Sequence, residues 1–273
     1  MVVEHLKTDG HRVRILARHP LDDSTVEWVR ADLGHSSNLA SAVEGVDAVI
    51  QAATHSPAAQ RSSFRPLDFI RSPTDVDIDG TCALLAAAEE AGVEHFVHVS
   101  IVGLEHMARI NPYSRVKLAP SDSCASRRCR GRSSARPGFH WLLERMLAKM
   151  ARKPLLLLPA GVRMQPVDSD EFAVTVAAAV ADGQRGERRD FAGPQTLTMR
   201  QLGEQYLAAR GLRRPIWTLP LPRKAKAALE PGNTSPGEPQ GAVTWAEWLH
   251  RPAAAWGSAL RDAGLVELRG LLG

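Results

Sequence analysis

The chain has 273 residues, 44% hydrophobic and 23% charged, with a formal net charge of +4, which predicts a folded protein with one large core, or a core domain and a small appendage. Because both signs of charge are interspersed, we expect no nucleic-acid partner, and three irregularly spaced cysteines predict neither a disulfide framework nor a metal site. The sequence has no signal-peptide pattern and no apolar run near the ~20 residues that span a bilayer, so we expect a cytoplasmic protein without a membrane partner.

Strand and helix signals alternate along the chain, which is the pattern of a parallel sheet covered by helices. Strands are predicted over residues 12–17, 26–31, 48–52 and 95–100, and an apolar one (LLLLPA) from Leu155. Helices are predicted near 37–44, 77–91, 141–151, 171–181 and 199–211, and over TWAEWLH (244–250). The fold class is therefore α/β.

The best evidence of chemistry is Ser100, which ends the run HFVHVS and is followed by Tyr113 and Lys117. In a helix, the i, i+4 spacing places the phenol and the ammonium on one face. The positive charge then favours the phenolate, which lowers the tyrosine pKa and suits it to proton transfer. Ser100 would hydrogen-bond a substrate carbonyl or hydroxyl. Because Tyr-x-x-x-Lys also occurs by chance, the prediction depends on the strand-end serine and the α/β pattern as well.

The chain resembles the atypical short-chain dehydrogenase/reductase family, in its NmrA-like NAD(P)-binding branch, over residues 1 to about 119 and 139 to about 250. The matching pieces are ARHP (17–20), AD (31–32), AAT (52–54), DVDIDGT (75–81), HFVHVS (95–100) and YSRVK (113–117). The resemblance implies a Rossmann-like, doubly wound parallel sheet that binds a nicotinamide dinucleotide at the carboxyl ends of its strands. It implies an NAD(P)-binding domain over 1–160 and a small substrate-side lobe over 161–250, and it leaves the tail 251–273 undecided.

The resemblance also implies residue roles. Asp32 would lie beside the adenine, and the run Ala52, Ala53 and Thr54 would let the cofactor approach closely. Tyr113 and Lys117 would lie near the nicotinamide ribose, which Lys117 would hold while it lowers the tyrosine pKa.

Arg18 follows the second predicted strand, where dinucleotide-binding folds discriminate between two cofactors. An acidic residue there favours NAD, whereas an arginine can clasp the 2′-phosphate of NADP with two hydrogen bonds. We therefore expect NADP, with NAD still possible. The alternative interpretation is a solvated arginine at a strand end.

The beginning of the chain departs from the family pattern. MVVEHLKTDGHRV reads as the second half of the helix that follows the first strand and its glycine-rich turn. That turn and the helix N-terminus receive the pyrophosphate. We therefore expect the first strand and the glycine-rich loop to be missing, a loss of about 15 to 20 upstream residues, and weak dinucleotide binding.

The segment 120–138, PSDSCASRRCRGRSSARPG, is a second departure because it loses apolar periodicity. One hypothesis is a frameshift: a coding stretch for AERLVRESALPWSILRATR, read one base late, gives this segment and would itself supply an apolar strand. A basic phosphate-binding loop or a redox cysteine pair are alternatives. Since buried parallel strands are near-continuously apolar and arginines are not buried unpaired, we predict a disordered or poorly packed segment and a sheet lacking two strands.

The leading hypothesis is an NAD(P)-dependent oxidoreductase that acts on a small carbonyl, alcohol or quinone, with Ser100, Tyr113 and Lys117 as catalytic residues. A non-catalytic NAD(P)-binding redox sensor is the first alternative, and an inactive, decayed product is the second. A small-molecule substrate is expected, and a homo-oligomer or a protein partner is left open.

Overall fold

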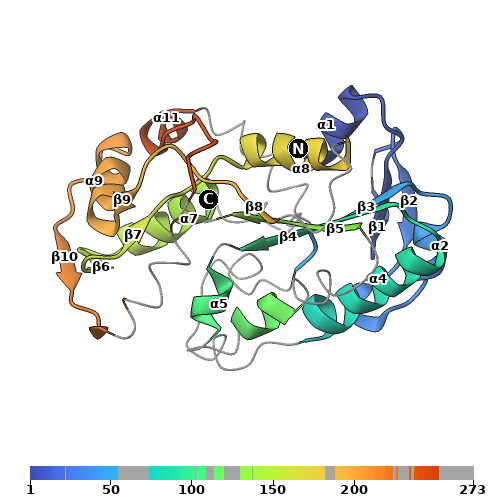
Figure 1. Cartoon of the computed structure of the whole chain (residues 1–273). Coiled ribbons are helices and arrows are strands. Elements are labelled where there is room, and N and C mark those ends of the chain that lie inside the picture. Colours follow the sequence, from blue (N-terminus) through green and yellow to red (C-terminus); the bar gives the residue numbers. More distant parts are fainter. Residues whose placement is uncertain are drawn as a thin grey trace.

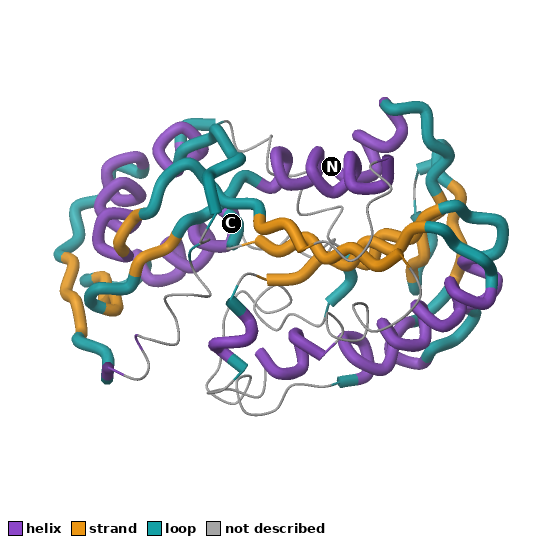
Figure 2. Tube along the Cα trace, in the orientation of Figure 1, coloured by secondary structure: helices purple, strands orange, loops and turns teal. Residues whose placement is uncertain are grey.

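A computed structural model describes residues 1–21, 23–54, 74–101, 103–108, 114–119, 130–136, 138–181, 188–223, 226, 234 and 237–251. Tyr113 and the tail beyond residue 251 lie outside these residues, and so does the first part of the segment 120–138. The middle of the molecule has three layers, with a parallel sheet between two layers of helices (Figures 1 and 2).

The central sheet has four parallel strands in the order β3-β4-β5-β8. They are β3 (Ala48–Gln51), β4 (His95–Ile101), β5 (Arg130–Arg136) and β8 (Arg188–Asp190). A separate parallel pair joins β1 (Arg14–Ala17) to β2 (Glu27–Arg30). β1 to β4 thus confirm the four strands predicted in the first hundred residues, to within two residues at each end.

The described strands do not pair β1 with β3. Among the described residues, β1 and β3 therefore belong to separate parallel sheets.

For residues 130–136, the strand β5 contradicts the prediction that the segment 120–138 adds no strand to the sheet. Residues Arg130–Arg136 form a strand that pairs with β4 along its whole length, from His95 opposite Arg130 to Ile101 opposite Arg136. Its other edge pairs with β8. The prediction was wrong here because it was drawn from side chains, whereas the ladder is made by backbone N–H and C=O groups that every non-proline residue carries.

Two helical layers cover the central sheet. On one side lie α1 (Val2–Thr8) and α8 (Ser169–Ala181), and on the other lie α2 (Leu39–Val43) and α4 (Thr81–Glu90) (Figure 1). α4 is rich in alanine and leucine, the best helix formers, and it stops before Gly92, which adopts the left-handed φ of +72° that favours glycine at a helix end. The predicted helix 77–91 thus exists, but a π-helix, η3 (Asp75–Gly80), precedes it.

The turn after β2 packs closely on η3. The 3-10 helix η1 (Leu33–His35) follows β2, and a Cβ atom at Gly80 would lie 2.4 Å from the Leu33 carbonyl oxygen. Only glycine allows two backbones to approach this closely. Gly80 therefore sets the distance between the end of β2 and the start of α4.

The C-terminal half builds a second unit on its own core. α7 (His140–Ala151), α9 (Met199–Ala209) and α11 (Trp245–Leu249) pack on a parallel pair, β6 (Leu156–Pro159) and β10 (Ile216–Leu219). Capping boxes begin α9 at Thr198 and α11 at Thr244. The remaining described elements are α5 (Leu104–Met107) and an antiparallel pair, β7 (Arg163–Met164) with β9 (Leu197–Thr198).

No helix within the described ranges is long and apolar enough to cross a membrane. The same residues contain no group of three or more His, Cys, Asp or Glu side chains placed to hold a metal ion.

Candidate functional site

Most of the buried polar side chains that the structure describes gather near the carboxyl ends of β3 and β4. Seven of them come from β3, η3, α4, β4 and the helical residues 114–119: Gln51, Asp77, Thr81, His98, Ser100, Ser114 and Lys117. The strands of a parallel sheet direct their carboxyl ends to one edge, where ligands bind in folds of this type. We call these seven residues the polar cluster.

The polar cluster centres on a buried ion pair. Lys117 Nζ lies 2.6 Å from Asp77 Oδ1, and each side chain is only 7% exposed. Lys117 also donates a hydrogen bond to the Thr54 hydroxyl, which in turn donates to Asp77 Oδ1 over 2.7 Å. Thr54, Asp77 and Lys117 therefore form a closed ring of contacts that fixes the ammonium at the end of β3.

His98 lies beside this ion pair and is neutral at physiological pH. Burial lowers its pKa to about 4; the Asp77 carboxylate opposes this shift, and the Lys117 ammonium adds to it. Its Nδ1 has no hydrogen-bond partner in the part of the chain that the structure describes. No site role was predicted for His98 from the sequence, so its position next to Lys117 is a finding of the structure.

Gln51 and Ser100 complete the polar lining of the strands. Gln51 is the register partner of His98 and donates from Nε2 to Thr81 Oγ1 over 2.8 Å, which links β3 to α4. Ser100 follows His98 by two residues, so both lie on the same face of β4, and Ser100 is buried. The strand-end serine predicted from the sequence therefore shares a sheet face with the histidine next to Lys117.

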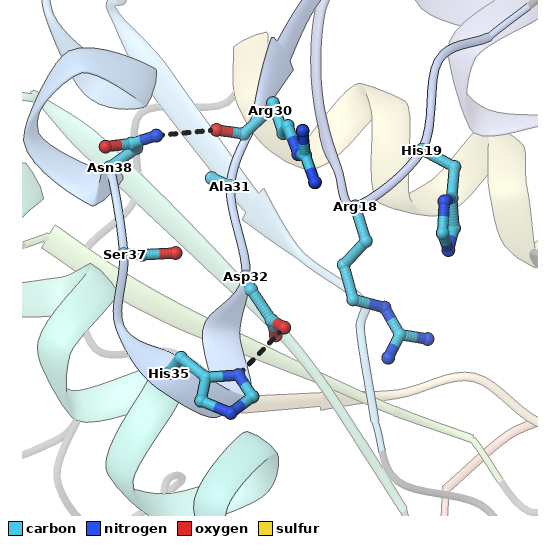
Figure 3. Close-up of a pocket in the computed structure, with 8 residues that line it drawn as sticks. All are labelled: Arg18, His19, Arg30, Ala31, Asp32, His35, Ser37 and Asn38. Atoms are coloured by element: carbon cyan, nitrogen blue, oxygen red, sulfur yellow. Dashed lines mark hydrogen bonds and ion pairs between the residues drawn. The ribbon is translucent and has the colours of Figure 1, made fainter.

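A second polar region lies at the carboxyl ends of β1 and β2. A cavity of about 420 Å³ is lined there by eight residues: Arg18, His19, Arg30, Ala31, Asp32, His35, Ser37 and Asn38. Figure 3 shows the Arg18 guanidinium facing the Asp32 carboxylate and the His35 ring across this space. The volume lies within the ~300–1,000 Å³ usual for small-molecule sites.

Asp32 already has protein partners in this cavity. Its Oδ1 accepts a hydrogen bond from the Gly34 N–H at 2.9 Å, which caps η1, and its Oδ2 lies 3.0 Å from His35 Nδ1. The hydrogen bond with His35 is the largest cause that lowers the pKa of Asp32, and the Gly34 N–H adds to it. Asp32 therefore shapes the turn after β2 as well as lining the cavity.

Two acidic residues of the C-terminal half, Asp168 and Glu144, have structural partners. Asp168 is 1% exposed; it caps α8 through the Asp170 and Glu171 N–H groups and pairs with Arg251 at 2.6 Å. Glu144 pairs with Arg210 at 3.2 Å. The first contact links the start of α8 to the end of α11, and the second links α7 to the end of α9.

The structure thus brings the predicted site residues together in two groups. Thr54 contacts Lys117, with Ala52 and Ala53 exposed just before it on the chain. Arg18 and Asp32 share the cavity beside β1 and β2. Tyr113 lies outside the described residues, so its position relative to Lys117 stays a prediction.

Asp77, which pairs with Lys117 at the centre of the polar cluster, was not among the site residues predicted from the sequence. It belongs to the DVDIDGT run (75–81) that carried the family resemblance, but no role was assigned to it. Its signal is helical spacing: in the predicted helix 77–91 it lies four positions before Thr81 and seven before Leu84, on the face that packs on the sheet, which indicates burial and hence a partner of opposite charge.

Comparisons with known proteins agree with this geometry. The family described as NAD(P)H-binding matches residues 1–121. The Photosystem II assembly factor Ycf39 of Trieres chinensis is 32% identical over 114 residues, which are 40% of this chain and only 33% of that protein.

Solved structures share the fold at low sequence identity. A short-chain dehydrogenase/reductase superfamily protein of Agrobacterium tumefaciens, with bound NAD, has a TM-score of 0.70 and 18% identity, over 96% of this chain and 95% of that one. The dTDP-glucose 4,6-dehydratase DesIV of Streptomyces venezuelae gives 0.68 and 19%, over 95% of both chains. The NADPH-dependent quinone oxidoreductase QOR2 of Escherichia coli gives 0.67 and 16%, over 91% of this chain and 93% of that one.

The family match, the parallel sheet and the position of the polar residues at its carboxyl edge agree on one class. The chain has a Rossmann-like fold, and its residues 1–121 match the family described as NAD(P)H-binding.

Proposed function

We propose that this protein is an NADP-preferring oxidoreductase that reduces or oxidises a small carbonyl, alcohol or quinone. The observation that carries the proposal is the Lys117 ammonium, held by Asp77 and Thr54 at the carboxyl end of β3 and next to the strand that bears Ser100. An ammonium fixed at this edge of the sheet lies where ligands bind in folds of this type.

The residues present fit a nicotinamide dinucleotide at two of its parts. The cavity beside β1 and β2 has the size and the cationic lining that suit a phosphate-bearing adenosine, and the polar cluster suits a ribose. When bound, the nicotinamide supplies the hydride. The described residues would supply orientation through Ser100 and Lys117, and Tyr113 would transfer the proton.

The preference for NADP is supported by Arg18 and Arg30, which line the same cavity. Asp32 does not oppose it strongly, because its carboxylate already accepts hydrogen bonds from Gly34 and His35. Arg18→Glu should therefore lower NADPH affinity by about tenfold or more while it spares NADH, since it replaces a phosphate donor by a repelling charge. Equal losses for both cofactors, measured by fluorescence titration, would argue against this preference.

A turnover assay distinguishes the proposed enzyme from a non-catalytic NAD(P)-binding protein. NADPH oxidation should be followed with a panel of small aldehydes, ketones and quinones, for the wild type and for Tyr113→Phe. Turnover in the wild type that falls by about 10² or more in the variant supports the enzyme, because general acid–base groups contribute ~10²–10⁴. Tight NADPH binding without turnover, unchanged by the substitution, would instead support a non-catalytic sensor.

The sensor remains the second candidate because of Asp77. Its carboxylate lies 2.6 Å from Lys117, so it offsets the positive charge on which a lowered tyrosine pKa depends. The relative from Trieres chinensis is also named as an assembly factor, which suits a binding role for this chain.

A further inference from the structure

The two-stranded sheet β6–β10 exposes an apolar face. Trp217 lies opposite Leu157 in the register, and Leu219 lies opposite Pro159. The exposed fractions are 63% for Trp217, 50% for Leu219 and 43% for Leu157, whereas Leu156 and Leu158 on the other face are buried. We call the face made by Leu157, Pro159, Trp217 and Leu219 the outer face.

The inner face of the same sheet is covered by α9. A Cβ atom at Gly203 would lie 2.9 Å from Leu158 Cδ1 and 3.3 Å from Ile216 Cδ1, so the helix packs directly on this side. The sheet lies at one end of the molecule with α9 beside it (Figure 1). The alternation of buried and exposed side chains therefore leaves three large apolar side chains of the outer face exposed, those of Leu157, Trp217 and Leu219.

Positive charge surrounds the outer face at both ends of its strands. The sequence carries no Asp or Glu over residues 145–167 or over 205–229, the two segments that contain β6 and β10. Six exposed cations flank the strands in these segments: Arg152, Lys153, Arg163, Arg213, Arg214 and Arg223. This surface is therefore complementary to an occupant that is anionic and partly apolar.

We propose that the outer face docks on an anionic lipid surface. Two strands of four residues cover on the order of 100 Å², far below the ~800 Å² per partner of a stable protein interface. A membrane needs no matched shape, attracts clustered Lys and Arg over a distance, and accepts tryptophan at its interface. A peripheral contact of this kind needs no membrane-spanning segment. The expectation of no membrane partner was based on the lack of such a segment, so it does not bear on a surface contact.

Vesicle binding tests the proposal with the full chain. Sedimentation with phosphatidylcholine vesicles, with and without an equimolar share of phosphatidylglycerol, should give at least about tenfold tighter binding to the anionic vesicles at low salt, and this difference should fall as salt screens the charges. Tryptophan emission should shift to shorter wavelength on binding.

Matched variants separate the apolar and the charged contributions. Trp217→Ser and Leu219→Ser should each weaken binding by several-fold to about tenfold, whereas Val174→Ser, at a residue 49% exposed on α8, should not. The double change Arg213→Gln/Arg214→Gln should weaken it more than Arg12→Gln/Arg115→Gln. Equal binding to both vesicle types, or no binding to either, overturns the proposal, and so does a loss no larger for Trp217→Ser than for Val174→Ser.

Discussion

At the residue scale, the candidate site is centred on an ion pair between two buried side chains of the protein. Lys117 and Asp77 are both buried and lie 2.6 Å apart. Removing one partner of such a pair leaves the other charge buried without its counter-ion. This usually lowers the free energy of unfolding by about 3–5 kcal/mol. The ring of Thr54, Asp77 and Lys117 is therefore a determinant of stability as well as a candidate binding element.

Asp77→Asn should lower the free energy of unfolding by about 3 kcal/mol, measured by urea denaturation at neutral pH. Asp79→Asn is the matched control, because Asp79 lies on the same π-helix but is exposed and contacts only Thr74 among the interactions described. A similar loss in both variants would show that the ion pair with Lys117 is not the cause.

Two buried histidines should make the protein sensitive to acid. Burial lowers the pKa of both His98 and His140 to about 4; His140 packs against Trp245 and Trp248 with ring centroids 5.7 Å away. The unfolded state binds these protons near the ordinary histidine pKa of ~6.5, so stability is present above that pH and falls as pH decreases toward 4.

The expected loss is about 3 kcal/mol for each histidine over that range. His140→Phe should remove one of the two contributions, so the pH dependence of the unfolding free energy should become shallower than in the wild type. His11→Phe, at an exposed residue, should leave the slope unchanged. Parallel slopes for the wild type and His140→Phe would contradict the assignment.

At the scale of elements, close backbone contacts decide where helices meet strands. η3 begins the α4 region with a π-helical turn, and Gly80 at its end lies against the Leu33 carbonyl. The sequence predicted a helix there, but not this turn, because a π-helix depends on local packing more than on residue type. The same contact holds η1, which directly follows the cavity residue Asp32, against η3, which bears Asp77.

Gly80→Ala should destabilise the fold by about 1–3 kcal/mol or more, because its Cβ would meet backbone atoms of Leu33 at 2.4–2.9 Å. Gly34→Ala is a suitable control: its Cβ would have neighbours no closer than 3.4 Å. Thermal unfolding of the two variants compares them directly, and an unaffected Gly80→Ala would show that the two backbones can separate at little cost.

At the scale of the whole molecule, the strands differ in how completely they are paired. β4 has partners on both edges, β3 and β5, whereas β1 and β2 form a sheet of two. Backbone amides in doubly paired strands open only with large unfolding events, and those at open edges exchange more readily.

Hydrogen exchange should therefore be slowest in β4 and faster in β1 and β2. Peptide-resolved mass spectrometry on the native chain measures this order. Equal protection of β2 and β4 would indicate that the two sheets act as one cooperative unit.

The sequence alone determined the α/β class, the four early strands and the positions of the main helices, because apolar periodicity and glycine stops are local properties. It also determined the residue types at the carboxyl edge, including Arg18, Ser100 and Lys117. Tertiary structure decided the rest. It pairs Lys117 with Asp77, 40 positions apart in the sequence, places His98 beside them, and makes a strand of Arg130–Arg136. These outcomes depend on distant partners, and backbone hydrogen bonds across a sheet can override what the side chains of one segment would favour alone.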